Sequence, residues 1–162
     1  MKRVIVIGCP GSGKSTFSKA LHKITEIPLY HLDMIYWNRD QTTVAKTVFW
    51  DRLSKILQKE EWIIDGNYGS TMEQRIQVCD TVFFLDYPTA LCLKGIEERR
   101  GTKRSDLPWV EQEFDEDFLA VIKNYPSQSR PKVMELLERY SQKEIVIFSS
   151  RRQAEEYLKK LQ

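Results

Sequence analysis

The sequence has few cysteines, no long hydrophobic run and no excess of one charge. Its 162 residues include 3 cysteines, 25 basic residues and 23 acidic residues. Three cysteines without a CxxC pair are too few for a disulfide framework or a zinc site, so we expect reduced thiols. The balance of charge excludes a global field that would recruit nucleic acid or an anionic membrane.

No stretch approaches the length of a membrane span, and no repeat or low-complexity linker divides the chain. The start, MKRVIVIGC, is basic and then apolar, but the apolar run is too short for a signal peptide and leads into a glycine-rich turn. We therefore expect a cytoplasmic protein without a membrane segment. With 41% hydrophobic and 30% charged residues, residues 1–162 are expected to form a single globular domain.

Short apolar runs alternate with longer amphipathic stretches, which predicts an α/β fold with a parallel sheet and crossover helices. The predicted strands are residues 3–7, 28–32, 62–65, 81–86 and 144–149. The predicted helices are residues 15–25, 42–59, 70–78, 88–100, 109–124, 131–140 and 151–161.

The helix predicted over residues 42–59 has one apolar face, and Thr42 or Thr43 is its predicted N-cap. That face consists of Val44, Val48, Leu53, Ile56 and Leu57. Residues 101–129 delay the final strand well beyond a normal crossover, so this insertion is a candidate lid. The alternative is an additional surface helix without a role in the chemistry.

The stretch GCPGSGKST follows the first predicted strand and opens a helix, and it satisfies GxxxxGK[ST]. Glycines let the backbone curl so that its N–H groups face phosphate oxygens, and the helix N-terminus adds partial positive charge. Lys14 is predicted to reach the β- and γ-phosphates and Ser15 to bind Mg²⁺. The predicted nucleotide-binding residues are Gly8, Cys9, Pro10, Gly11, Ser12, Gly13, Lys14, Ser15 and Thr16.

Acidic residues end three predicted strands, at the edge where the sheet binds ligands. Asp65 is the preferred magnesium partner, because Gly66 after it leaves room for close approach. Asp86 is the competing candidate. Asp33 is predicted to orient or deprotonate an acceptor hydroxyl, although it could instead cap a turn. His31 is interpreted as a packed histidine.

A basic cluster marks the start of the candidate lid. It contains Arg99, Arg100, Lys103 and Arg104, and Arg130 follows the lid. Guanidinium groups on a closing lid can stabilise charge on a transferring phosphoryl group. The alternative is a solvated face of salt bridges with nearby acids.

Three segments, GCPGSGKST, WIIDGN and VFFLDYP, together resemble the small P-loop kinases of the adenylate kinase and shikimate kinase type. Arg99, eleven residues after the proline of the third segment, fits the same order. More narrowly, YHLDMIYW, WIIDGNY, FLDYPTALCL and NYPSQSRPKVMELL resemble bacterial proteins called DNA topology modulation proteins, a kinase-like family of uncertain substrate. The resemblance covers nearly the whole chain.

The resemblance implies a three-layer P-loop NTPase fold, with a five-stranded parallel sheet in the order 2-3-1-4-5 flanked by helices. It implies an acceptor-binding helical part at about residues 34–60 and a lid at about residues 101–129. It also implies that Asp65 is the magnesium-associated aspartate, Asp33 the acidic residue on the acceptor side, and Arg99 a lid-base arginine that contacts nucleotide phosphates.

Other positions match the family less closely. Arg104 and Arg130 match arginines in the corresponding segments, and Arg151 either stacks over the adenine or begins a helix. Gly95 stands where these kinases commonly carry an arginine, and Lys94 beside it lacks the planar fork of a guanidinium group. This departure puts the strength of phosphate clamping in question.

The motifs predict an ATP- and Mg²⁺-dependent phosphotransferase acting on a small-molecule acceptor: a nucleoside, a nucleotide or a hydroxyl metabolite. Asp33 favours a hydroxyl acceptor. The alternative is a P-loop ATPase or regulatory protein with a direct or indirect effect on DNA topology. The chain has no NKxD segment to read guanine and no DNA-binding motif, which argues against a GTPase and against direct nucleic-acid binding.

Overall fold

The computed structural model describes all of residues 1–162, and a parallel sheet of five strands forms its centre. The strands are β1 (Arg3–Gly8), β2 (Leu29–His31), β3 (Trp62–Asp65), β4 (Thr81–Leu85) and β5 (Glu144–Phe148). They lie in the order β2-β3-β1-β4-β5, which confirms the predicted topology. The central strands β1, β3 and β4 are almost wholly buried and mainly apolar, because helices cover both faces of the sheet.

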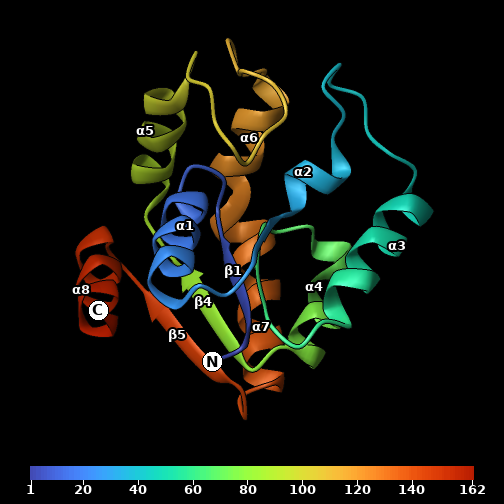
Figure 1. Cartoon of the computed structure of the whole chain (residues 1–162). Helices are drawn as coiled ribbons and strands as arrows, with labels where there is room; N and C mark the ends of the chain where they lie inside the picture. Colours follow the sequence, from blue (N-terminus) through green and yellow to red (C-terminus); the bar gives the residue numbers. More distant parts are fainter.

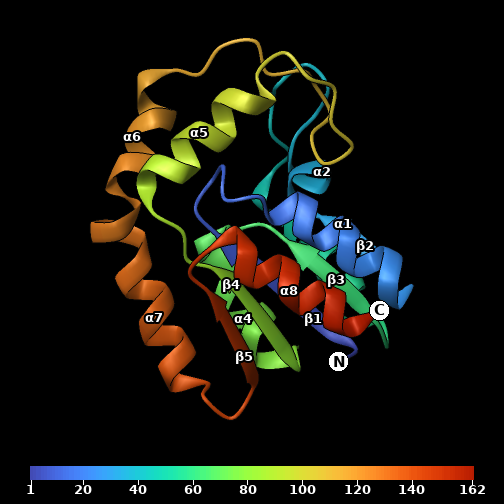
Figure 2. The same cartoon turned by 90° about the vertical axis from the view of Figure 1, so that its left-hand side faces the viewer.

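Helices flank the sheet on both sides. They are α1 (Lys14–Thr25), α2 (Leu32–Tyr36), α3 (Lys46–Leu57), α4 (Gly69–Val78), α5 (Thr89–Arg99), α6 (Glu116–Asn124), α7 (Arg130–Arg139) and α8 (Arg151–Leu161). Helices α1 and α8 lie side by side over one face, and α4 and α7 lie over the other (Figure 1, Figure 2). None of the helices is both long and apolar enough to cross a membrane.

The helix predicted over residues 42–59 is shorter than expected. It begins at Lys46, and no side chain caps its first turn. Thr42 instead accepts a hydrogen bond from Asn38 and donates one to Asp40 in the preceding turn. The predicted threonine cap was therefore wrong, because local side-chain bonds hold the turn in a non-helical conformation.

The buried face of α3 also differs in part from the predicted one. Leu53 and Ile56 are buried as expected, whereas Val48 is 40% exposed. Phe49 is buried instead, and its ring packs against those of Tyr36 and Tyr68. The aromatic contacts therefore place Phe49, and not Val48, on the inward face in the first turn of the helix.

The helix predicted over residues 109–124 starts later, at Glu116, where the Asp115 side chain caps it by accepting the N–H of Phe118 at 2.7 Å. A π-helical turn, η1 (Tyr125–Ser129), then joins α6 to α7 without a break. Figure 2 shows the resulting helical rod along one side of the molecule. Before the rod, residues 100–115 form an irregular segment, which we call the lid loop.

Gly95 brings α5 into direct contact with the loop between β1 and α1. A Cβ atom on Gly95 would lie 2.0 Å from the carbonyl oxygen of Gly11, and one on Gly11 would lie 2.1 Å from that of Cys92. No side chain fits at position 95, so the missing arginine reflects packing. Lys94 does not replace it, because its side chain is 70% exposed and lies 4.0 Å from Glu98.

Replacing Gly95 with alanine is expected to destabilise the protein by about 1–3 kcal/mol, because the added methyl group collides with backbone. In an ordinary helix this substitution would be stabilising, by about 1 kcal/mol. Urea unfolding measures the difference, and Lys94→Ala on the exposed side of the same helix is the matched control. Equal or greater stability of Gly95→Ala would contradict the close contact.

Candidate functional site

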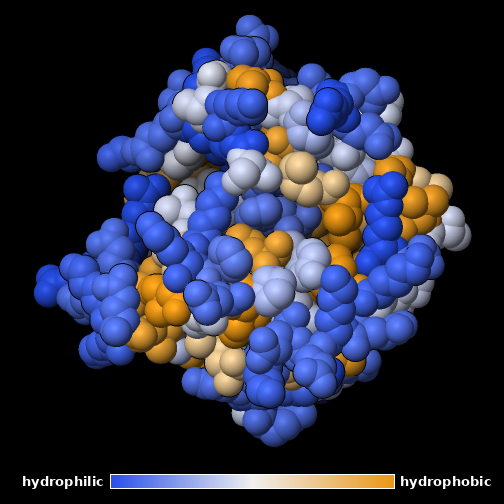
Figure 3. Space-filling model, viewed as in Figure 1, coloured by the Kyte–Doolittle hydropathy of each residue, from blue (hydrophilic) through white to orange (hydrophobic).

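A cavity of about 1310 Å³ opens at the carboxyl ends of the strands. Figure 3 shows a hollow on this face, with hydrophobic surface inside it and a largely hydrophilic rim. All the predicted site residues line the cavity except Gly8, Cys9 and Arg130. The Cys9 thiol is instead buried behind the loop, where it meets the thiol of Cys92.

The loop between β1 and α1 forms a cradle around the side chain of Lys14. The Lys14 ammonium donates to the carbonyl oxygens of Gly8, at 2.9 Å, and Cys9, at 3.2 Å. Burial lowers the pKa of Lys14. At the helix N-cap, Gly13 has a left-handed backbone, and the space beside its Cα is open.

The cradle fits a polyphosphate. The Ser12 hydroxyl is buried in the loop without a hydrogen-bond partner, and the ammonium of Lys14 has only neutral carbonyl partners. The N-terminus of α1 adds backbone N–H groups and partial positive charge, which favour an anion. A phosphate chain would satisfy all three of these features.

Asp65 and His31 end adjacent strands and form a pair. The two residues are register partners in β3 and β2, and His31 Nδ1 lies 2.8 Å from Asp65 Oδ2. His31 is therefore more than the packed residue that we expected, since it orients one oxygen of Asp65. No group of three or more acidic, histidine or cysteine side chains could hold a metal on its own. Magnesium here would need phosphate oxygens together with Ser15 and Asp65.

The competing carboxylate, Asp86, belongs to a different contact. It accepts bonds from Arg130 Nε at 2.9 Å and from Arg130 Nη2 at 2.8 Å. Asp86 does not line the cavity. The pair fastens the start of α7 to the end of β4, so Arg130 is not directed toward the phosphate cradle.

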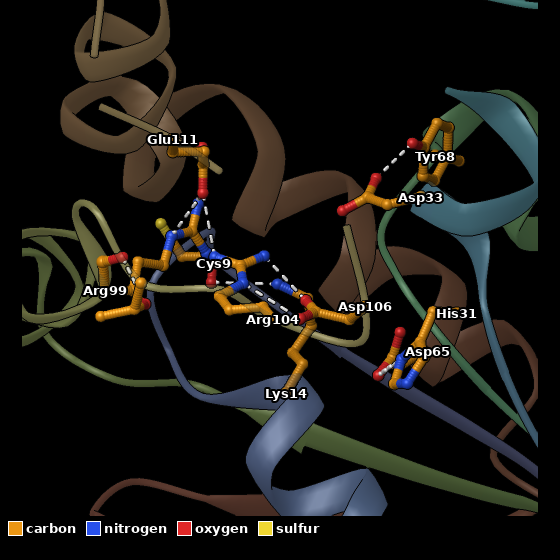
Figure 4. A network of polar contacts seen from close by, with 11 residues as sticks. Cys9, Lys14, His31, Asp33, Asp65, Tyr68, Arg99, Arg104, Asp106 and Glu111 are labelled. Carbon is orange, nitrogen blue, oxygen red and sulfur yellow. Dashed lines mark hydrogen bonds and ion pairs between the residues drawn. The ribbon is translucent and has the colours of Figure 1, made fainter. Parts of the chain in front are cut away.

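Asp33 lies at the start of α2, on the side of the cavity beyond β3. The Tyr68 hydroxyl donates a short hydrogen bond to Asp33 Oδ1 (Figure 4). Burial raises the pKa of Asp33, while the bond from Tyr68 and the charge of Lys14 oppose that rise. Burial and the negative charge of Asp33 raise the pKa of Tyr68, so the phenol remains a donor.

Arg75 is a residue of this site that the sequence did not indicate. It is fully buried, and burial lowers its pKa to about 9. Its guanidinium group donates to the carbonyl oxygens of Gly66, Asn67 and Tyr68 and to the hydroxyl of Thr71. These four hydrogen bonds from the planar guanidinium group fix the loop after β3 without a carboxylate partner.

Asn67 connects that loop to the phosphate cradle. Its side chain accepts the N–H of Gly8 at 3.1 Å and donates to the Gly8 carbonyl oxygen at 2.5 Å. Asn67 and Tyr68 directly follow Asp65 in the sequence. One short loop therefore holds the cradle, supports Asp33 and extends from Asp65.

The lid loop lies over the cradle, where its Arg104 and the adjoining Arg99 of α5 line the cavity. Arg104 donates both arms of its fork to Asp106, at 3.0 and 2.8 Å, and also lies 2.9 Å from Glu111. Arg99 Nε lies 3.1 Å from the same Glu111 oxygen. Both arginines thus face the cavity in salt bridges that are largely shielded from solvent. Arg100 pairs instead with Glu97 on the outer surface.

Arg151 stands at the other end of the cavity, at the start of α8. Its Nη1 lies 3.9 Å from Glu98 of α5, and both residues line the cavity. Ser150 caps the helix by accepting the N–H of Gln153. Arg151 therefore begins a helix, one of the two alternatives that the sequence left open, and it also lines the cavity; stacking over an adenine stays a prediction.

The sheet order, the glycine-rich loop and its lysine define the fold of a P-loop NTPase of the kinase type. No protein-family model and no curated protein matches the sequence. Shikimate kinase from Bacteroides thetaiotaomicron matches with a TM-score of 0.60 and 18% identity, over 99% of this chain and 96% of that one.

Two further solved structures show the same similarity. Shikimate kinase from Acinetobacter baumannii in complex with shikimate has a TM-score of 0.65 and 13% identity, over 99% of this chain and 90% of that one. Deoxyadenosine kinase from M. mycoides with bound dATP has a TM-score of 0.53 and 18% identity, over 99% of both chains. At these identities the likeness shows the fold alone. The narrower resemblance to DNA topology modulation proteins stays a prediction.

Asp33→Asn is expected to raise the free energy of unfolding near neutral pH. The pKa of Asp33 in the folded protein lies above its ordinary value of 3.8, because ionisation is unfavourable in the fold. Stability is therefore lost as the pH rises from 3.8 through the folded pKa. Below pH 3.8 the carboxyl group is protonated in both states, and the gain disappears. Urea unfolding at several pH values measures this, with Asp117→Asn on the exposed face of α6 as the control. A stability gain of Asp33→Asn that grows toward low pH would contradict a raised pKa for Asp33.

Proposed function

We propose that the protein is a phosphotransferase that moves the γ-phosphoryl group of MgATP to the hydroxyl group of a small-molecule acceptor. The observation that carries this proposal is Asp33, a carboxylate held by Tyr68 on the far side of the cavity from Arg151. The cavity volume, about 1310 Å³, exceeds that of most single-ligand pockets. There is room for a nucleotide and a second molecule.

The nucleotide would occupy the side of the cavity formed by α1, α5 and α8. Lys14 and the backbone of the cradle would bind the β- and γ-phosphates, and Arg151 would lie beside the adenine. Magnesium, held by Ser15 and the phosphates with Asp65 behind it, would neutralise charge on the phosphate oxygens. His31 would keep the Asp65 carboxylate oriented toward the metal.

Asp33 would act on the acceptor. Oδ1 is occupied by Tyr68, which leaves Oδ2 to accept the proton of the acceptor hydroxyl as its oxygen bonds to the γ-phosphorus. The bond between that phosphorus and the β–γ bridging oxygen breaks, and ADP leaves. A raised pKa suits this role, because a general base works best when its pKa approaches the working pH.

Arg99 and Arg104 would stabilise the charge on the transferring phosphoryl group. The names of the structural neighbours, kinases of shikimate and of deoxyadenosine, support a small-molecule acceptor. The alternative of an effect on DNA gains no support here. The lid arginines pair with Glu111 and Asp106, so they form no free basic surface for a nucleic-acid backbone.

A screen of nucleosides, nucleotides and small polyols for acceptor-dependent ADP release tests the proposal. One hydroxyl acceptor is expected to stimulate ADP release, Lys14→Ala to abolish it, and Asp33→Asn to lower it by about 10²–10⁴-fold, the usual contribution of a general base. ATP binding should survive in Asp33→Asn. ATP hydrolysis that no acceptor stimulates, or full transfer by Asp33→Asn, would show that the proposal is wrong.

Tyr68→Phe is expected to lower kcat by about tenfold and to move the acidic limb of the kcat/KM profile to higher pH. The hydrogen bond from Tyr68 lowers the pKa of Asp33, so its removal lets that pKa rise. Tyr36→Phe is the matched control, because Tyr36 belongs to the same aromatic cluster but makes no hydrogen bond to Asp33. Identical pH profiles for the two variants would argue against positioning by Tyr68.

A further inference from the structure

Asp106 of the lid loop lies deep in the candidate nucleotide site. Although the loop is irregular, Asp106 is only 7% exposed, and the adjacent Leu107 is equally buried. The carboxylate receives both arms of the Arg104 fork, and the nearby hydroxyl of Ser15 is among the groups that stabilise its charge. Figure 4 shows it between Arg104 and the pair formed by Asp65 and His31.

This is the position that a bound nucleotide needs. Ser15 is the magnesium ligand of the proposed function, and the N–H groups at the start of α1 face the same space. A carboxylate beside Ser15 occupies space that a phosphate and its metal would need. Two anions a few ångströms apart repel each other strongly in a partly buried site. A triphosphate therefore cannot bind fully while Asp106 stays on Ser15.

Ion pairs within the lid loop, and between the loop and Arg99 at the end of α5, stabilise this position of the loop. Arg104 pairs with Asp106 and Glu111, and Arg99 shares Glu111. Lys14 is occupied by backbone carbonyl groups. Trp109, within the lid loop, also holds it: the Trp109 ring lies edge-on against that of Trp37, with centroids 5.1 Å apart. Hence no arginine of the lid loop waits unpaired for a phosphate.

We propose that the lid loop is autoinhibitory: Asp106 fills the phosphate and magnesium position over Ser15 until nucleotide displaces it, and its departure releases Arg104 to the phosphates. The inference rests on the proposed function only in taking the cradle to bind a nucleoside triphosphate. Only the displaced state of the loop is competent to bind nucleotide. The measured affinity is therefore weaker than the affinity of that state, by the free energy needed to displace Asp106.

The opposite role for Asp106 is a ligand that helps to hold magnesium. The two roles predict opposite changes in nucleotide affinity when Asp106 is replaced. A magnesium ligand strengthens binding of the metal–nucleotide complex, so its loss weakens that binding. A competing carboxylate weakens nucleotide binding whether or not magnesium is present. Its loss therefore strengthens the binding of the free nucleotide and of the metal–nucleotide complex.

Calorimetric titration of the full chain distinguishes the two roles. The probes are ATP without magnesium and a non-hydrolysable ATP analogue with magnesium. Asp106→Asn keeps the shape and the acceptor oxygen but removes the charge, and it is expected to bind both probes about 10- to 100-fold more tightly than the unmodified chain. Asp106→Ala should bind at least as tightly as the unmodified chain. Asp117→Asn, which removes a charge from the exposed face of α6, should not alter affinity.

Affinity that is unchanged or weaker in both Asp106 variants, with both folded by circular dichroism, would overturn the inference. That result differs from a failure of the proposed function, in which ATP binds as described but no acceptor receives a phosphoryl group. Titration measures nucleotide binding without any transfer step, so the two failures are separable.

Tryptophan emission gives a second readout. Displacement of Asp106 should disturb the contact between Trp109 and Trp37, so magnesium-free ATP is expected to shift the emission of the unmodified chain. Trp109→Phe should lose most of that shift, although three other tryptophans remain. Emission that does not change when calorimetry shows ATP to be bound would contradict movement of the lid loop.

Discussion

The phosphate cradle keeps its curvature because its neighbours contact its backbone from outside. On one side α5 reaches the Gly11 carbonyl through Gly95, with no side chain between them. On the other side the Asn67 amide binds both polar groups of Gly8. Both contacts reach the loop from outside, so the residues that fix its shape do not themselves occupy its inner surface, where an anion would bind.

Arg75 fixes the loop that connects the cradle to Asp33. A buried cation without a carboxylate is unusual, and it is tolerated because four neutral oxygens satisfy its fork. The same interactions fix the loop from Gly66 to Tyr68, and hence the support of Asp33. One short segment of backbone therefore connects Asp33 to the cradle, and independent motion of Asp33 relative to the cradle is restricted.

Sequence patterns predicted those features that have a local signature. The strands are apolar runs, the cradle is a spaced motif, and Asp65 ends β3 while Asp33 follows β2 at the start of α2, so the parallel sheet brings both to one edge. The role of Arg75 was not predictable in this way, because bonds to carbonyl oxygens leave no pattern in the side chains. Gly95 was interpreted as a lost arginine, since only the folded chain reveals what its missing Cβ would meet.

The helical rod from α6 to α7 restricts how the lid can open. The rod continues through η1 as far as Arg139, and the pair of Arg130 with Asp86 fastens it to the sheet. At the other end of the lid loop, Gly101 has a φ of 70°, a conformation that most residues avoid. If the proposed displacement of the lid loop occurs, the rod limits it to the residues before Glu116, and Gly101 is the position in that stretch whose backbone conformation is unusual.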